Sequence, residues 1–150
     1  MIVGVRVLGT PAPQGSKRHV GGGRLVESSK AVGPWREAVV GACQRGQIAE
    51  KRIDDAVAVR LTFWLTRPAS HKRANGELRP NAPLAPGRTP DLDKLVRSTL
   101  DALVQAAVIT DDSRVVTIHA RKRYADDNAP GALIWIDTHT PDTDEQENAA

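Results

Sequence analysis

The fold is decided by residues 90–123, which read PDLDKLVRSTLDALVQAAVITDDSRVVTIHARKR. Apolar residues recur here at helical spacing, and this pattern predicts a helix from Leu92 to Ala107 with one apolar face. Residues 115–123 then alternate, which predicts a strand. The turn between the two elements contains Asp111 and Asp112. The apolar stripe of the helix comprises Leu92, Leu95, Val96, Leu100, Leu103, Val104 and Ala107.

Further elements on both sides of this stretch indicate an α+β fold. A second amphipathic helix is expected to begin at a cap provided by Ser28 or Ser29 and to end near Gly46. Alternating stretches predict additional strands. These strands are expected at residues 2–8, 24–26, 56–66 and 133–137.

The order of these elements predicts one domain. We expect residues 1–140 to form a single α+β domain, with one mixed β-sheet and two main helices packed on it. Residues 141–150 hold four acids and no base, and they are expected to be a disordered acidic tail. A chain of 150 residues is long enough for one compact domain with a core and short for two.

The composition excludes several classes of protein. Hydrophobic residues make up 40% of the chain, as in ordinary globular proteins. No apolar run approaches the roughly 20 residues needed to span a bilayer, and residues 1–9 lack the features of a signal peptide. The single cysteine, Cys43, excludes an internal disulfide and a Cys-based zinc site. A cytoplasmic location is the default expectation.

The charge is unevenly distributed. The net charge is +3, but leaving out the four acids of the tail leaves 21 basic against 14 acidic residues. A basic body with an acidic tail suits a polyanionic partner such as nucleic acid. The alternative is an ordinary solvated surface.

Two polar segments carry much of the basic charge. Residues 11–23 combine prolines and glycines with Lys17-Arg18-His19, which is typical of a loop. Residues 67–90 form a long connection with five prolines and six basic side chains. A connection of this length inside a compact domain is usually functional or mobile. It is either a plain mobile loop or an arm that contacts DNA.

Carboxylates surround the helix at residues 92–107. Asp91 and Asp93 flank its start and can converge on one point, whereas Asp112 lies beyond its end. Hard cations such as Mg²⁺ prefer oxygen ligands, and they can activate water and neutralise charge on phosphate. Asp112 meets the other two only if the chain turns back after the helix. The alternative is that Asp91 is a helix cap and that Asp111-Asp112 is only a turn.

Charged residues also follow one side of the same helix. Asp93, Arg97 and Asp101 are spaced four residues apart. Such spacing favours a surface ladder of ion pairs, each worth a few tenths of a kcal/mol. The alternative places Arg97 near a scissile phosphate, where it counters charge in the transition state.

Two stretches resemble a known family. Residues 90–103, PDLDKLVRSTLDAL, followed by residues 108–116, VITDDSRVV, are similar to the core of RusA-type Holliday junction resolvases. The resemblance is close over residues 88–124. It implies a small Mg²⁺-dependent endonuclease, often encoded by a phage or prophage, that acts as a homodimer and cuts four-way DNA junctions symmetrically.

The resemblance also implies roles for individual residues. Asp91, Asp93 and Asp112 would be the catalytic metal-binding carboxylates, and Asp101 would have a supporting role. The family usually has Asn at the position of Lys94 and a catalytic Lys at the position of Arg97. Arg keeps the positive charge but cannot lose its proton. Arg97, assisted by Lys94, is therefore expected to stabilise the transition state.

The predicted function is that of an endodeoxyribonuclease that resolves Holliday junctions by paired symmetric nicks. Mg²⁺ is the expected cofactor, with Mn²⁺ as a substitute, and no membrane or organic cofactor is expected. The rival functions are a non-catalytic protein that binds junctions, and a nuclease for flaps or forks. Phosphate contacts are expected from Lys17, Arg18, Lys72, Arg73, Arg121 and Arg123.

Overall fold

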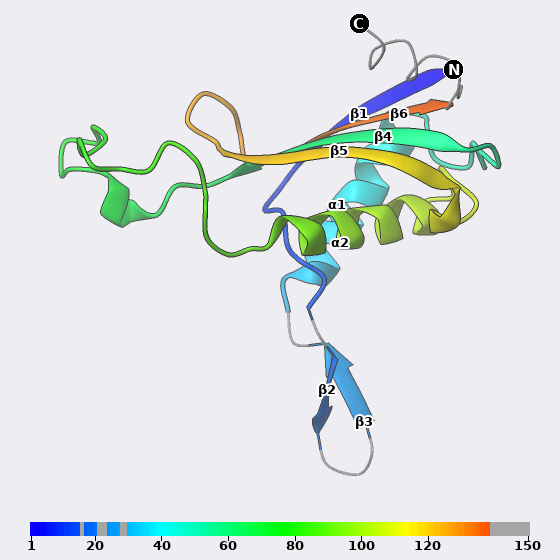
Figure 1. Cartoon of the computed structure of the whole chain (residues 1–150), viewed down its shortest axis with the longest axis horizontal. Coiled ribbons are helices and arrows are strands. Elements are labelled where there is room, and N and C mark those ends of the chain that lie inside the picture. The colour runs from blue at the N-terminus through cyan, green and yellow to red at the C-terminus, as the bar shows by residue number, and fades with distance from the viewer. Residues whose placement is uncertain (16, 21–23, 28–29, 139–150) are drawn as a thin grey trace, which may run out of the picture.

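The computed structural model describes residues 1–15, 17–20, 24–27 and 30–138, and only the backbone of residues 17–20 and 24–27. Its centre is a four-stranded mixed sheet in the order β1-β6-β4-β5 (Figure 1). The sheet strands are β1 (Ile2–Leu8), β4 (Val57–Leu65), β5 (Val115–Tyr124) and β6 (Gly131–Thr138). The predicted α+β architecture with one mixed sheet is confirmed. None of the described helices is long and apolar enough to cross a membrane.

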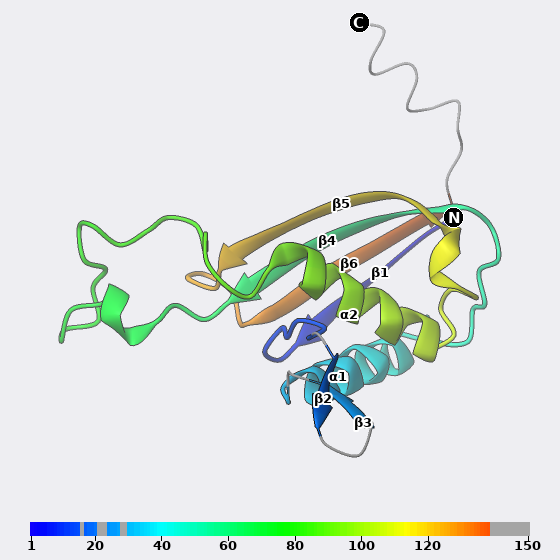
Figure 2. The same ribbon diagram turned by 60° about the horizontal axis from the view of Figure 1, so that its bottom comes forward.

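Two helices cover one face of this sheet. They are α1 (Val32–Arg45) and α2 (Leu92–Gln105), and both lie below the sheet in Figure 1. β4 and β5 are parallel and are joined through α2, whereas β6 pairs antiparallel with β1 and β4. None of the helices in the described ranges packs on the opposite face of the sheet (Figure 2).

The core lies between the sheet and the two helices. Every second residue of β4 is buried, as its alternation predicts. Trp35 of α1 is 1% exposed, packs against Phe63, and donates a hydrogen bond from Nε1 to Thr99 Oγ1 at 3.2 Å. The position of Trp35 in the core is the default expected for a large aromatic residue on an amphipathic helix.

The buried face of α2 differs from the predicted stripe. Leu95 and Leu103 are fully buried, but so are Ser98 and Thr99. The Thr99 hydroxyl donates to the carbonyl of Leu95, and the one proton of the Ser98 hydroxyl is shared between the carbonyl of Ala12 at 2.7 Å and that of Leu95 at 3.1 Å. These hydrogen bonds remove the cost of burying the hydroxyls. The helix is therefore rotated from the orientation that its leucines and valines alone would favour.

The N-terminal part also corrects two expectations. Helix α1 begins at Val32, and Ala31 occupies its N-cap position without a side-chain hydrogen bond, so the predicted Ser28 or Ser29 cap is wrong. Ser28 and Ser29 themselves lie outside the described residues. Part of the segment expected to be loop is instead strand β2 (Lys17–Val20), which pairs antiparallel with β3 (Arg24–Glu27).

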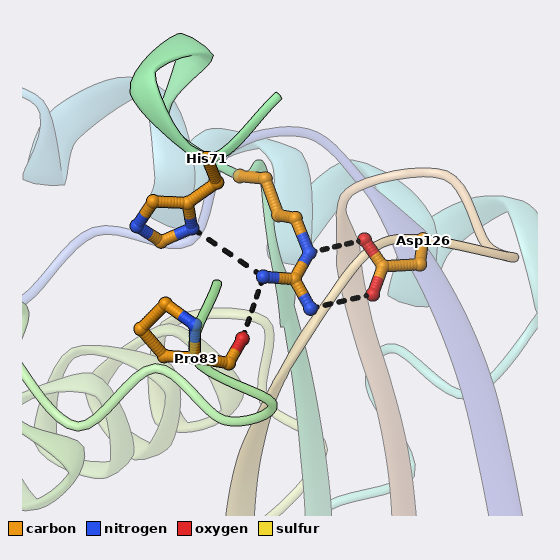
Figure 3. Close-up of polar contacts among 4 residues, drawn as sticks. His71, Pro83 and Asp126 are labelled. Carbon is orange, nitrogen blue, oxygen red and sulfur yellow. Dashed lines mark hydrogen bonds and ion pairs between the residues drawn. The ribbon is translucent and has the colours of Figure 1, made fainter. Parts of the chain in front are cut away.

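The long connection between β4 and α2 projects away from the sheet and contains a 3₁₀ turn, η1 (Ala69–His71) (Figure 1). Arg67 anchors its base through contacts of its guanidinium with His71, Pro83 and Asp126, which are labelled in Figure 3. Its guanidinium donates to both carboxylate oxygens of Asp126, at 2.7 and 3.0 Å, and to the carbonyl of Pro83 at 2.6 Å. It also lies 4.2 Å from the ring centroid of Tyr124. Arg67 is thus buried and is not available to contact DNA.

Candidate functional site

Asp91 occupies the N-cap position of α2 with an extended backbone, directly after the cis peptide bond between Thr89 and Pro90. Its carboxylate makes no capping hydrogen bond. The side chain is half exposed, and its Oδ2 lies 3.4 Å from Lys94 Nζ. The alternative in which Asp91 serves only as a helix cap therefore lacks the contact that defines such a cap.

Lys122 fixes the backbone that leads to Asp91. This lysine lies on the helix-facing side of β5 and is half-buried. Its Nζ donates to the carbonyls of Arg88 at 2.6 Å and Pro90 at 2.8 Å. Three donors on a single ammonium group can hold two carbonyls at once. Lys122 is not among the residues predicted from the sequence, where its only signal is a lysine at a core-facing position of an alternating strand.

Asp93, Arg97 and Asp101 follow one side of α2, as their spacing predicts. Asp93 and Arg97 are exposed, and Asp101 is half-buried. In the described structure, Arg97 forms an ion pair with neither aspartate. The ion-pair ladder is therefore not formed. Asp93 lies in the first turn of α2, where the helix dipole favours a negative charge.

Asp111 and Asp112 have different surroundings. Asp111 caps the short 3₁₀ helix η2 (Asp112–Arg114), because its Oδ2 accepts a hydrogen bond from the backbone N–H of Ser113 at 3.0 Å. The hydrogen bonds from Ser113 lower the pKa of Asp111. Asp112 is exposed. Of the two neighbours, Asp111 is the one that makes a capping contact.

The three carboxylates implied by the resemblance do not meet within one chain. Helix α2 has 14 residues, or about 21 Å at 1.5 Å per residue. η2 lies at the end of α2 opposite Asp91 (Figure 2). Among the residues that the structure describes, no three acidic, histidine or cysteine side chains are arranged to hold a metal. Asp112 instead lines a depression of about 380 Å³ together with Asp101, Asp111, Arg36 and Gln105.

The donor types at the start of α2 nevertheless fit a hard cation. Asp91 and Asp93 are two exposed carboxylates within one helical turn, and both are free of capping contacts with backbone N–H groups in the described structure. Mg²⁺ is commonly held by one or two carboxylates together with water and substrate phosphates. Lys94 and Arg97 supply positive charge on the same turn and the next.

The predicted phosphate contacts are spread over three parts of the molecule. Lys72 and Arg73 are exposed on the projecting connection. Arg121 and Arg123 are exposed on the helix-free face of the sheet, where Arg121 Nε donates to Thr62 Oγ1 at 3.2 Å. Lys17 and Arg18 lie in β2, but their side chains are outside the described part of the chain.

Comparison with known proteins identifies the family of the chain. The family model of endodeoxyribonuclease RusA matches residues 9–137. A search of curated proteins gives no match. The matched region includes α1, α2, the projecting connection and the aspartates at both ends of α2. The chain therefore belongs to the RusA family of endodeoxyribonucleases, structure-specific nucleases that resolve Holliday junctions.

Proposed function

We propose that this nuclease depends on Mg²⁺ and resolves four-way junctions by paired nicks as a homodimer. The observation that best supports this proposal concerns Asp91. This residue occupies the N-cap position of α2, but its side chain makes no capping hydrogen bond. An acidic side chain at this position, beside Asp93, is available to bind a cation. Mn²⁺ is expected to replace Mg²⁺.

The residues around Asp91 divide the chemical work. Asp91 and Asp93 would hold the cation, which supplies an activated water and neutralises charge on the scissile phosphate. Arg97 carries no ion pair in the described structure, so its guanidinium is free to approach a phosphate oxygen. Lys94 is paired with Asp91 and would orient that carboxylate.

A second subunit would complete the site. Asp112 is separated from Asp91 by the length of α2, so one chain cannot bring the two carboxylates to one ion. In a two-fold dimer, however, the partner's Asp112 can lie against Asp91 and Asp93 if the α2 helices run antiparallel across the interface. This arrangement creates two identical sites, which suits paired cuts in two symmetric strands.

The deciding experiment compares four substrates in Mg²⁺ and in EDTA. Labelled four-way junction, flap, fork and plain duplex are each incubated with the protein. We expect Mg²⁺-dependent symmetric nicks on the junction alone. Preferential cutting of flaps or forks would assign the protein to a different branched substrate, and tight junction binding without cleavage in either Mg²⁺ or Mn²⁺ would overturn the proposal.

The same assay tests the assigned carboxylates. Asp93→Asn is expected to abolish cleavage while preserving or strengthening binding, because it removes a negative charge next to the DNA. Asp55→Asn, at an exposed aspartate before β4, is the matched control and should cut normally. If Asp93→Asn cut at the normal rate, the assignment of the site would be wrong.

A further inference from the structure

The helix-free face of the sheet is basic and partly aromatic. It is formed by the outward side chains of all four strands, which lie in cross-strand rows. We call this surface the open face. Asp137 is the one acidic residue at the outward positions of the four described strands. The polar and aromatic members that matter here are Arg6, Arg60, Thr62, Trp64, His119, Arg121, Arg123 and Trp135.

Trp135 is the exposed aromatic residue of the open face. It pairs with Gly4 on β1 and with Arg60 on β4. Its six-membered ring lies directly over Gly4, where a Cβ atom would overlap the ring atoms. Even so, 45% of Trp135 remains exposed. The absence of a side chain at Gly4 thus lets the indole pack directly on the backbone of β1, while much of the ring stays accessible.

The other indole on this face, that of Trp64, is covered by the side chain of Arg6. Arg6 places its guanidinium carbon 4.4 Å from the ring centroid of Trp64. The same guanidinium donates to the carbonyls of Val7, Ala129 and Ala132. Arg6 and Trp64 are therefore structural, and Trp135 is the indole left for a ligand.

A shallow depression of about 490 Å³ adjoins Trp135. Its rim carries Arg60, His119 and Arg121, and its lining includes Thr62 and Leu133. Arg60, His119 and Arg121 are all exposed. Cations around an exposed aromatic ring form the combination that binds single-stranded nucleic acid, since the ring stacks on a base and the cations follow the phosphates.

We infer that the open face binds an unpaired DNA strand. Trp135 stacks on a base, and Arg60 and Arg121 contact the flanking phosphates. This inference rests on the proposed function. The branched substrate of that function supplies the unpaired strand. Because the carboxylates belong to the helix layer behind the sheet, the strand held here is not the strand being cut.

Two other occupants fit this surface less well. A second copy packed face to face would bring the arginines of two open faces together without enough carboxylates to neutralise them, which is costly when water is excluded. Duplex DNA keeps its bases stacked on each other, so an indole on a flat sheet has no base face to contact. The proposed dimer would in turn use α2 and η2, which leaves the open face free.

The test measures binding of the full chain to a labelled oligothymidylate and to a matched duplex. EDTA is present so that no cleavage occurs. We expect Trp135→Ala to weaken oligothymidylate binding by about tenfold, the scale of one base stack. Trp135→Phe should retain much of the affinity. Arg60→Gln with Arg121→Gln should weaken binding and reduce its dependence on salt. The control is Arg45→Gln, at an exposed arginine of α1, which should bind like the unmodified protein.

Two results would overturn the inference. One is oligothymidylate binding that is unchanged in Trp135→Ala. The other is a shift of the Trp135→Ala protein from dimer to monomer in sedimentation, since the face would then be a subunit interface. A protein that binds oligothymidylate through Trp135 but cuts no junction would refute the proposed function alone. Junction cutting with oligothymidylate binding independent of Trp135 would refute this inference alone.

Discussion

Arg67 and Asp126 form a bidentate ion pair across 59 residues of sequence, with Nε–Oδ1 at 2.7 Å and Nη2–Oδ2 at 3.0 Å. The guanidinium side is buried and the carboxylate side is partly exposed. The pair joins the start of the projecting connection to the turn after β5, and the bond to Pro83 draws a later part of the connection to the same point. The connection is thus fixed at its base by these contacts.

This ion pair predicts a pH-dependent anchor. The hydrogen bond from Arg67 lowers the pKa of Asp126 below its ordinary value. A carboxyl with a lowered folded-state pKa contributes stability above its unfolded-state pKa of about 4 and loses it as the pH falls through the folded-state pKa. Asp126→Asn should therefore lower Tm at neutral pH, and the difference from the unmodified protein should shrink in acid.

Limited proteolysis checks the same anchor locally. Asp126→Asn should make residues 67–90 more readily cleaved at neutral pH, because one side of the bidentate contact is lost. The matched control is Asp127→Asn, at the adjacent exposed aspartate, which should leave the cleavage pattern unchanged. Equal protease sensitivity of the two variants would show that the ion pair does not hold the connection.

Lys122 is predicted to position Asp91. Lys122→Met keeps the apolar stem but removes both hydrogen bonds to residues 88–90, so the backbone before Asp91 loses its support. Loss of such a supporting contact typically costs roughly 10- to 100-fold in activity or metal affinity. We expect kcat for junction cleavage to fall on this scale while junction affinity changes little.

Two further variants distinguish a positioning role of Lys122 from a simple effect of its charge on kcat. Lys122→Arg keeps the charge and can still donate to a carbonyl, so it should recover part of kcat. Lys51→Met, at an exposed lysine after α1, removes a charge elsewhere and should not change kcat. A fall in junction affinity with an unchanged kcat would instead make Lys122 a phosphate contact.

Periodicity predicted most of the fold because burial in the sheet follows residue type closely. The alternating stretch at residues 56–66 becomes β4, and residues 115–123 become β5 with one further residue. Burial follows residue type closely in β4, where every second residue is buried, whereas no residue of β5 is fully buried. The same reasoning placed the start of α2 correctly at Leu92.

Buried polar residues escaped prediction because their partners are distant in sequence. Ser98 and Thr99 interrupt the apolar stripe, yet they are buried since Ala12, Leu95 and Trp35 satisfy their hydroxyls. The sequence grouped Arg67 with the other basic residues of the connection, but the structure shows it buried against Asp126. For the candidate site, sequence spacing identified the aspartates, but only the structure shows that Asp112 lies at the far end of α2.

The different surroundings of Asp91 and Asp111 predict opposite effects of substitution. Asp91→Ala removes a carboxylate that makes no capping bond, so it should abolish cleavage with little change in Tm. Asp111→Ala removes a capping acceptor, so it should lower Tm while retaining cleavage. Asp111→Asn can still accept the bond from Ser113 and should restore Tm. Loss of cleavage in a folded Asp111→Asn protein would instead make Asp111 part of the site.

A mixture of two inactive variants tests whether each site is shared between subunits. Asp93→Asn and Asp112→Asn should each be inactive alone. In a heterodimer of the two, a shared arrangement gives one site with both substitutions and one site with neither. Cleavage should therefore return, but as single nicks instead of paired ones, and this is measured by separating nicked from resolved junctions on gels. If each site belonged to one chain, every site in the mixture would carry a substitution, and the mixed dimers would stay inactive.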